Sequence, residues 1–309
     1  MSSDMPVDMP AEPVETPAES TAPIAQWGEM ALTMMFTLVA VLFVSFLAVV
    51  TGLVWPDFRS GCIVIGFNEI LLGGVLSRWH SGLRGVMSLH LVIGNKNYSS
   101  WSFRPWLAMK VAGISFDETV ASLDAADFKT RVLALGGSGR VPVLSDGDVH
   151  IWESLAILEY LAERFPAAKL WPENPAARAR ARAIASEMHA GFASLRRHLP
   201  MNVARPVKFR ALDAGAAKDV ARIDAIWTEC RDKYGTGGPF LFGSFGAVDA
   251  MFAPVVWRFH TYAVEVSSTS LGYMRAMMSL PAWNEWRDAA RRETWVLEED
   301  EVDWPQVLR

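Results

Sequence analysis

Two patterns of apolar residues follow one another along the chain after residue 86. Residues 87–170 alternate short apolar stretches with segments of helical periodicity, whereas residues 171–309 show helical periodicity alone. In the first part the pattern predicts strands at 88–93 and 115–122, a hairpin at 141–151 with its turn at Asp146-Gly147, and helices at 103–113, 124–135 and 153–165. This βαβαββα order predicts one mixed sheet covered by helices, a thioredoxin-like domain over 87–170.

The second part, residues 171–309, predicts an all-helical domain. Asn174 and Pro175 have the residue types of a helix cap and of a first helical position. Apolar residues then repeat in steps of three and four in two series. These are Ile184, Met188, Phe192, Leu195 and Leu199, followed by Val220, Ile223, Trp227, Cys230 and Tyr234.

A stretch without charge between Asp249 and Arg258 predicts the central buried helix of this domain. We expect Gly246 to be its N-cap and Asp249 to place a carboxylate in its first turn. Residues 281–295 predict a last helix on the surface.

The turn at residues 93–106, IGNKNYSSWSFRPW, is rich in hydroxyl groups just before a predicted helix. Because proline is tolerated no deeper than about the third helical position, Pro105 limits where that helix can begin. The candidates for the N-cap include Ser102, and serine is the best cap among them. We therefore expect Ser102 to cap the helix and Ser99 and Ser100 to lie in the loop, facing the positive helix end.

The first 86 residues have a different composition from the rest. Residues 1–29 contain no Lys or Arg and are rich in Pro, Ala and Glu, which predicts disorder. Residues 30–56 carry no charge and are long enough to predict a transmembrane helix. Residues 57–86 form a linker or a second apolar segment, in which Glu69 disfavours a second span.

Two interpretations of this extension stay open. In one, the acidic leading flank and the arginines that follow residue 56 place the N-terminus outside and anchor a cytoplasmic domain at the inner membrane. In the other, the folded chain begins at Met87, directly before the first strand, and the extension is an artefact of the assigned gene start.

Charge and cysteine content exclude several classes of protein. Residues 87–309 contain 26 acidic and 26 basic residues, without the basic stripe that nucleic acid would attract. Cys62 and Cys230 are far apart and form no C-x-x-C pair, and the histidines form no ligand pair. We expect no disulfide framework, no metal site and a reduced, cytoplasmic setting.

Pro142 stands at the head of the first strand of the predicted hairpin, where a residue that cannot donate to the ladder is tolerated. If the bond from Val141 to Pro142 is cis, the N–H and C=O of Val141 turn outward and can pair with an extended peptide. Only about 5–6% of X-Pro bonds are cis, so the residues alone do not decide this.

Four segments, in this order and spacing, resemble the cytosolic glutathione transferase superfamily over residues 87–309. They are NYSSWSFRPWLAMKVAGI, RVPVL, ESLAILEYL and GPFLFGSFGAVDAMFAPVVWRF. The first is similar to the SSCSWR turn of zeta-class enzymes, with Trp101 in place of the cysteine, and to bacterial transferases that carry NYSSWS-x-RPW. The resemblance implies a thioredoxin-like domain followed by an all-helical domain, a serine-type active site and a homodimer.

The resemblance also implies roles for particular residues toward glutathione, the co-substrate. Ser99 would face the sulfur, with Ser100 as the second hydroxyl. The backbone of Val141, before Pro142, would pair with the cysteinyl unit. For the two ends of glutathione, the resemblance implies Glu153 and Ser154 at the γ-glutamyl end and Arg140 at the glycine carboxylate.

A helix N-terminus and a donated hydrogen bond both favour a thiolate, so this arrangement suits attack on a small hydrophobic electrophile. Trp101 and Trp106 are candidates for the electrophile site, although packing roles compete. His189, His198 and His260 receive no role, and we expect Arg258 to pair with an acid. Three functions stay open: glutathione transfer, an isomerisation of the maleylacetoacetate type, and a binding module without catalysis. The absence of the zeta-class cysteine weakens the isomerase interpretation.

Overall fold

A computed structural model describes residues 89–303 of the protein. The predicted segments 1–29, 30–56 and 57–86 lie outside the described residues. Within residues 89–303, no helix combines the length and the apolar character that a membrane span needs.

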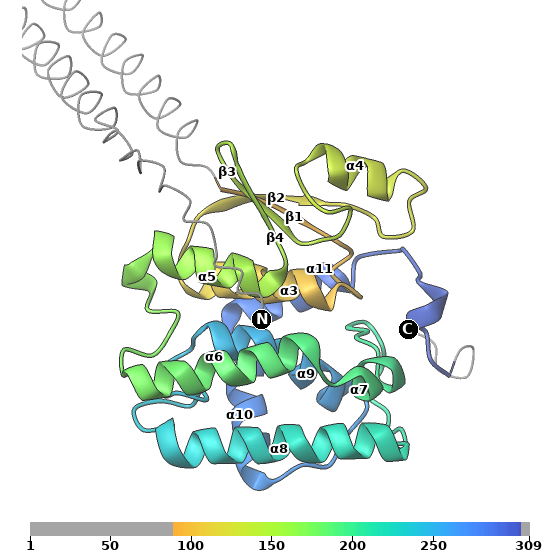
Figure 1. The fold of residues 1–309 in the computed structure, drawn as a ribbon. Coiled ribbons are helices and arrows are strands. Elements are labelled where there is room, and N and C mark those ends of the chain that lie inside the picture. Colours follow the sequence, from red (N-terminus) through yellow and green to blue (C-terminus); the bar gives the residue numbers. More distant parts are fainter. Residues whose placement is uncertain (1–88, 304–309) are drawn as a thin grey trace, which may run out of the picture. The chain divides into compact units, whose positions relative to one another are not determined.

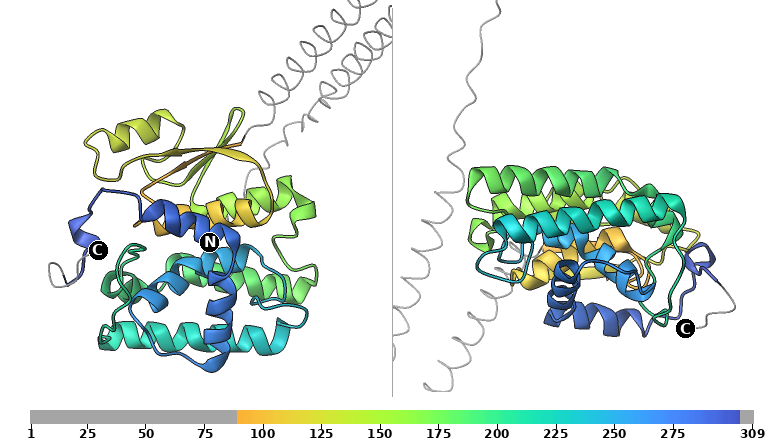
Figure 2. Two further views of the ribbon diagram at one scale, coloured as in Figure 1. Left: turned by 180° about the vertical axis from the view of Figure 1, so that it is seen from behind. Right: turned by 90° about the horizontal axis from the view of Figure 1, so that it is seen from below.

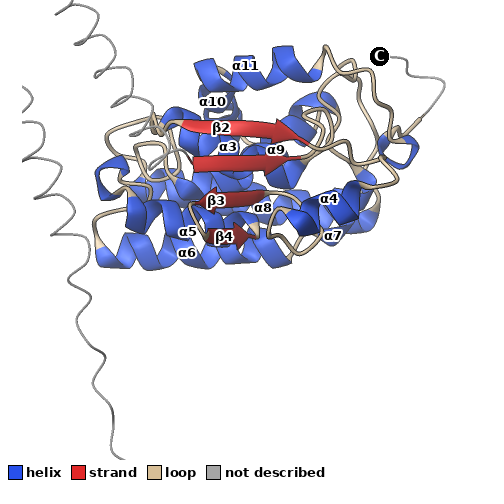
Figure 3. Cartoon of the chain, turned by 90° about the horizontal axis from the view of Figure 1, so that it is seen from above, coloured by secondary structure: helices blue, strands red, loops and turns tan. Residues whose placement is uncertain are grey.

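The first part of the described chain is a four-stranded sheet with helices on both faces (Figure 1). Its elements are β1 (Leu89–Ile93), α3 (Ser100–Val111), β2 (Phe116–Val120), α4 (Phe128–Ala134), β3 (Val143–Asp146), β4 (Val149–Trp152) and α5 (Ser154–Arg164). The strand order is β2-β1-β3-β4, with β1 parallel to β2 and the other pairs antiparallel (Figure 3). The predicted mixed sheet and the βαβαββα order are confirmed.

Alternation along β1 separates two cores. Leu89, Leu91 and Ile93 point to the face covered by α3 and α5, and Val92 points to the face covered by α4. Successive side chains of a strand point to opposite faces, so a strand with apolar residues at both phases is buried on both sides.

The N-terminus of α3 differs from the prediction. The helix begins at Ser100 with Ser99 as its N-cap residue, and Pro105 lies inside the helix. Ser102 is not the cap, because its hydroxyl accepts a hydrogen bond from the backbone N–H of Gly94 at 3.0 Å. That long-range bond joins the end of β1 to the helix and outweighs the intrinsic preference of serine for a cap position.

The second part is helical throughout. It contains α6 (Pro175–Ala190), α7 (Ala193–His198), α8 (Ala214–Tyr234), α9 (Ala247–Thr261), α10 (Ser268–Met278) and α11 (Pro281–Ala290), with short 3₁₀ turns at Pro166–Ala168 and Glu298–Asp300. Asn174 caps α6, accepting from the N–H groups of Ala176 and Ala177 at 3.0 Å each, as predicted. The first series of apolar residues predicted from the sequence, from Ile184 to Leu199, is spread over two helices. The chain breaks between α6 and α7 at Phe192, which adopts φ 60°.

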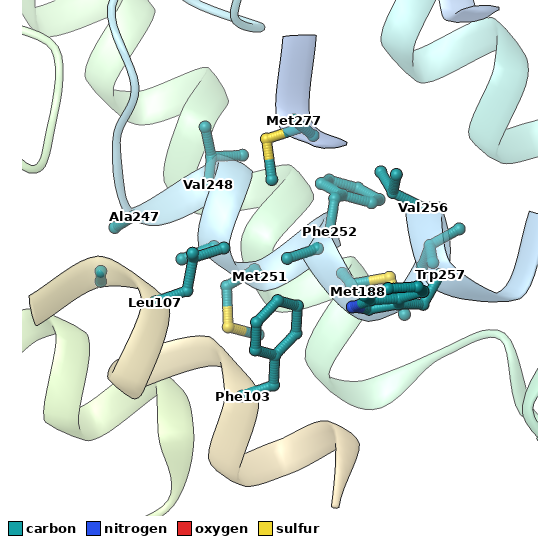
Figure 4. Close-up of a cluster of buried hydrophobic side chains, with 14 of the residues drawn as sticks. Phe103, Leu107, Met188, Ala247, Val248, Met251, Phe252, Val256, Trp257 and Met277 are labelled. Atoms are coloured by element: carbon teal, nitrogen blue, oxygen red, sulfur yellow. The ribbon is translucent and has the colours of Figure 1, made fainter. Parts of the chain in front are cut away.

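Helix α9 is the predicted central helix and is buried along almost its whole length. Figure 4 shows its apolar side chains packed between Phe103 and Leu107 of α3, Met188 of α6 and Met277 of α10. Its start is held by Asp249, whose two carboxylate oxygens accept from Leu241 N at 3.1 Å and Gly246 N at 2.9 Å. The predicted cap is confirmed.

Helix α11 is only partly a surface helix. Its inner face carries Trp283 and Trp286, both buried, which pack against Phe103 of α3 at ring distances of 5.3 and 4.9 Å. The chain after α11 then passes back alongside the sheet (Figure 2). The C-terminal helix therefore joins the helical part to the sheet-bearing part.

We expect Asp249→Ala to lower the free energy of unfolding by about 2–4 kcal/mol, because two buried N–H groups lose their acceptors. Burial raises the pKa of Asp249 to about 7, so the protonated carboxyl stabilises the folded state at acidic pH, and this contribution is lost as pH rises through about 7. The loss of unfolding free energy in Asp249→Ala should therefore be larger at about pH 5 than at about pH 8.

Chemical denaturation at the two pH values measures both effects. Asp288→Ala, at an exposed position of α11, is the matched control and should change the free energy of unfolding by less than about 0.5 kcal/mol. A deficit for Asp249→Ala no larger than that of the control would contradict the capping role.

Candidate active site

The turn between β1 and α3 is fixed from both parts of the protein. Its backbone N–H groups at Lys96 and Asn97 donate to the carboxylate of Glu293, which follows α11, at 2.7 and 2.9 Å. The side chain of Asn97 accepts from Ala204 N at 2.7 Å and donates to Asn202 at 3.1 Å. The turn is thereby held in one position before the first helical residue.

Ser99 lies at the end of this turn and is almost fully buried. Its hydroxyl donates to the hydroxyl of Ser102 at 2.7 Å, which in turn accepts from Gly94 N. Gly94 has no space for a side chain, since a Cβ there would lie 2.8 Å from Leu123 and 3.0 Å from Ser99. The position of the Ser99 hydroxyl therefore depends on Gly94 and Ser102.

Ser99 and Ser100 both line a cavity of about 330 Å³. It has walls from both parts of the chain, from the turn, from the segment before β3, and from α7 and α9. Its remaining lining residues include Tyr98, Trp101, Arg140, Val141, Arg196, Arg258 and Asp300. Ser99 and Ser100, predicted to supply hydroxyl groups, therefore line the same cavity as Arg140 and Val141, which were predicted to bind glutathione.

A second cavity of about 350 Å³ shares Trp101, Arg140 and Val141 with the first. The other predicted residues lie here, since Pro142, Glu153 and Ser154 line it. The two cavities are neighbours with three lining residues in common, and we refer to them together as the Ser99–Ser154 cleft. All seven residues predicted from the sequence to bind or activate glutathione line this cleft.

The segments at Pro142 and Glu153 have unusual backbone conformations. The Val141–Pro142 bond is cis, and Pro142 directly precedes β3. Glu153 adopts φ 71° and ψ 122° as the N-cap residue of α5, without a side-chain capping bond. A non-glycine residue at positive φ is strained and persists only where its surroundings hold it, which is frequent at functional sites.

Ser154 opens α5 and is fully buried, with its hydroxyl 4.0 Å from the sulfur of Met251 in α9. Its neighbour Glu153 is exposed and lies 3.6 Å from His189 Nε2 of α6. Burial lowers the pKa of His189, and the nearby guanidinium groups of Arg104 and Arg196 lower it further while Glu153 raises it. His189 is therefore neutral at neutral pH.

The two tryptophans predicted as candidates for the electrophile site lie in different surroundings. Trp101 lines both cavities, and the guanidinium groups of Arg104 and Arg196 lie over its ring at 4.0 and 4.6 Å from the centroid. Trp106 is fully buried and lines neither cavity; its Nε1 donates to Glu118 at 2.6 Å and its ring packs on Trp286. The helical phase of Trp106 turns its side chain to the core, so of the two candidates for the electrophile site only Trp101 lines the cleft.

Three arginines converge near Trp101. Arg104 is fully buried on α3, Arg196 lies on α7, and Arg258 is almost fully buried on α9. Burial and mutual repulsion lower the pKa of Arg104, and the pKa values of Arg196 and Arg258 fall to about 10. Arg196 and Arg258 are therefore still charged at neutral pH.

Neither this group of arginines nor His189 was predicted from the sequence to line the cleft. Arg258 is in no ion pair among the residues that the structure describes, contrary to our expectation; its Nη1 donates to the carbonyl of Leu199 at 2.5 Å and the side chain lines the cavity at Ser99. Periodicity gave no signal for these residues, because each lies on a different helix.

Within residues 89–303, no cluster of three His, Cys, Asp or Glu side chains is arranged to hold a metal ion. Cys230, the one cysteine in this range, is buried and unpaired, and burial raises the pKa of its thiol to about 11. The polar and charged side chains that line the cleft carry hydroxyl, guanidinium, carboxylate and imidazole groups.

Comparison with known proteins identifies the class to which this fold and cleft correspond. Residues 98–164 match the glutathione S-transferase N-terminal domain, and residues 175–289 match the glutathione S-transferase C-terminal domain. Together the matches cover more than half of the chain. The protein belongs to the glutathione S-transferase superfamily.

Individual relatives are more distant. A stringent starvation protein A homolog of Coxiella burnetii is 27% identical over 59% of this chain and 80% of its own length. A probable maleylacetoacetate isomerase of Vibrio cholerae is 26% identical over 55% of this chain and 81% of its own. The solved structure of a bacterial zeta-class maleyl pyruvate isomerase has a TM-score of 0.53 and 20% identity, covering 67% of this chain and all of that one. This last likeness shows the fold.

We expect Ser102→Ala to destabilise the protein by about 1–3 kcal/mol, because the buried N–H of Gly94 loses its acceptor. Chemical denaturation followed by tryptophan fluorescence measures the loss. Ser279→Ala, which removes an exposed hydroxyl at the end of α10, is the control and should cost less than about 0.5 kcal/mol. Equal losses in the two variants would show that the bond from Gly94 contributes nothing.

Proposed function

We propose that the protein is a glutathione transferase that holds glutathione along the Ser99–Ser154 cleft and activates its thiol at Ser99. The γ-glutamyl end lies at Glu153 and Ser154, the cysteinyl backbone pairs with Val141, and the glycine carboxylate binds Arg140. The observation that carries the proposal is the gathering of these residues, from three separate segments, along the Ser99–Ser154 cleft with Ser99 at a helix N-terminus.

The hydrogen bonds of Ser99 allow it to donate to sulfur. Ser102 already accepts from Gly94 N, and its own proton is free to rotate toward the Ser99 oxygen. When Ser102 donates to Ser99 in this way, the Ser99 proton is released from its present partner and points at the ligand. Glutathione binding therefore requires only the rotation of two hydroxyl groups.

Fixed charges favour the ionised thiol at the same place. A free thiol has a pKa of about 8.5, and a helix N-terminus or a nearby cation lowers it. Ser99 is the N-cap residue of α3, and the cavity that it lines also contains the guanidinium groups of Arg196 and Arg258. The hydrogen bond and these charges together stabilise the thiolate, which then attacks an electrophilic carbon.

A glutathione-dependent isomerase of the maleylacetoacetate type is the second candidate. The relative from Vibrio cholerae that is named as such an isomerase aligns with 55% of this chain. In an isomerase the sulfur adds to the substrate and leaves again, so glutathione is regenerated. Loss of free thiol during turnover therefore distinguishes transfer from isomerisation.

A binding module without catalysis is the third candidate; the Coxiella burnetii relative is named as a stringent starvation protein A homolog rather than as a transferase. Such a module has no need of a hydroxyl network at Ser99 or of the strained backbone at Glu153, so we favour the enzyme. The cytoplasmic setting and the homodimer are part of the same proposal.

We expect Ser99→Ala to raise the thiol pKa of bound glutathione by about 1–2 units, since a hydrogen bond to a charged group is worth about 1.5–3 kcal/mol. The ultraviolet absorbance of the thiolate, followed against pH on the full chain saturated with glutathione, gives this pKa. Calorimetry should show that the affinity for glutathione at low pH, where the thiol is neutral, changes little.

Ser100→Ala is the matched control, since Ser100 lines the same cavity one residue further along. It should shift the thiol pKa by less than half as much as Ser99→Ala. A larger shift for Ser100→Ala would assign activation to that hydroxyl, and no glutathione binding by the unmodified chain would refute the enzyme.

A further inference from the structure

The cavity at Ser99 has a wall that does not suit a purely hydrophobic electrophile. Besides the hydroxyl groups, Arg196 of α7 and Arg258 of α9 line it. Both are partly or fully withdrawn from solvent, and both keep their positive charge at neutral pH. Burying a charge is costly unless a partner compensates for it, so this wall needs an anion.

Arg258 is held with part of its guanidinium free for a ligand. Its Nη1 donates to the carbonyl of Leu199, which fixes the plane of the group at the edge of the cavity. A carbonyl compensates for only part of the charge, and Asp300 attracts Arg258 without forming an ion pair with it within residues 89–303.

Arg196 is fixed in a similar way. Its Nε and Nη2 donate to the carbonyls of Gly191 and Met188, where the chain breaks between α6 and α7. Its guanidinium lies over the ring of Trp101, which also lines the cavity. The side chain is thus ordered before any ligand arrives, which lowers the entropy that binding would cost.

A third guanidinium adds to the surplus of positive charge. Arg104 is fully buried beneath Trp101, and its Nη1 and Nη2 have no hydrogen-bond partner among the described residues. Its single hydrogen bond is from Nε to the carbonyl of Met251 at 3.0 Å. Such a group raises the positive potential throughout the cavity wall.

Acidic groups offset part of this charge. Asp300 lines the cavity, where burial raises its pKa to about 6, and its carboxylate acts on Arg258. Asp219 acts on Arg196 and Glu153 on Arg104, but neither carboxylate lines the cavity at Ser99. The charged residues that line this cavity are therefore three arginines, of which Arg140 is assigned to the glycine carboxylate of glutathione, and one acid.

We propose that the electrophile of this transferase is an anion, a molecule bearing a carboxylate, and that Arg196 and Arg258 bind this carboxylate while the reacting carbon faces Ser99. The inference rests on the proposed function and adds the class of the second substrate. Arginine presents paired N–H donors that match the two oxygens of a carboxylate, so two such groups on one wall favour this anion.

Two probe electrophiles that differ in one charge test the proposal. They are 4-chloro-3,5-dinitrobenzoate and its methyl ester. In each, the sulfur of glutathione bonds to the ring carbon that carries chlorine, chloride leaves with the bonding electrons, and the thiol proton passes to solvent. The quantity measured on the full chain is the ratio of kcat/KM for the acid to kcat/KM for the ester, divided by the same ratio of uncatalysed rates.

We expect this normalised ratio to exceed one in the unmodified protein. In Arg258→Met and Arg196→Met it should fall roughly tenfold to hundredfold, as for the loss of a hydrogen bond to a charged group. Arg258→Lys keeps the charge but not the paired donors, so its ratio should lie between those of Arg258→Met and the unmodified protein. Arg196 is only partly buried, so its variant tests the proposal even if Arg258→Met fails to fold.

Arg197→Met is the matched control, since Arg197 is the exposed neighbour of Arg196 and does not line the cavity. It should leave the ratio unchanged within about twofold. The thiol pKa of bound glutathione, measured in each variant, separates binding of the anion from activation of the thiol.

The outcomes distinguish failure of the proposed anion site from failure of the proposed transferase. Turnover of both probes with a normalised ratio near one, or an equal loss with both probes together with a raised thiol pKa, would overturn the anion site and leave the transferase intact. No glutathione binding and no turnover of either probe would overturn both. A high ratio that collapses only in the Arg196 and Arg258 variants would establish the anion site.

Discussion

The carboxylate of Glu293 fixes the segment on which the cleft depends. It accepts from two successive backbone N–H groups of the turn between β1 and α3, although burial raises the pKa of this carboxyl. Those two bonds join the end of the helical part to the first turn of the sheet-bearing part. Ser99, two residues beyond Asn97, then enters the cleft in one orientation. The chemistry proposed for Ser99 therefore depends on a residue nearly two hundred positions away in the chain.

The elements that could be predicted from the sequence are those specified by local pattern. The strand β1, the hairpin of β3 and β4, the Asn174 cap and the carboxylate of Asp249 each involve residues within a few positions of one another, and the structure confirms them. The two turn residues of the hairpin are Gly147 and Asp148, one position later than expected. The residues assigned to glutathione came from resemblance rather than from pattern, and the structure places them along one cleft, although their roles stay proposals.

The features that the sequence did not predict are those fixed over long distances. Ser102 was expected to cap α3, but its hydroxyl accepts a hydrogen bond from the N–H of Gly94, and the helix begins three residues earlier than that cap would allow. Trp106 was a candidate for the electrophile site, but contacts with Glu118 and α11 bury it. In both cases a partner distant in sequence decided the outcome, and neither helical periodicity nor residue preference contains that information.

The arginines of the cleft were also not predicted from local pattern, and their charges affect which electrophile the cleft favours. Arg104, Arg196 and Arg258 come from three different helices, so no local pattern announces that they converge. Bringing three like charges together out of water opposes folding, and a protein retains such an arrangement only where something offsets the cost. Asp300, Asp219, Glu153 and the carbonyl groups offset part of it in the free protein, and a bound anion adds to this. A neutral electrophile would add nothing, so we expect the cleft to attract an anion and to disfavour a neutral molecule, which cannot offset the desolvation of the arginines that line the cavity.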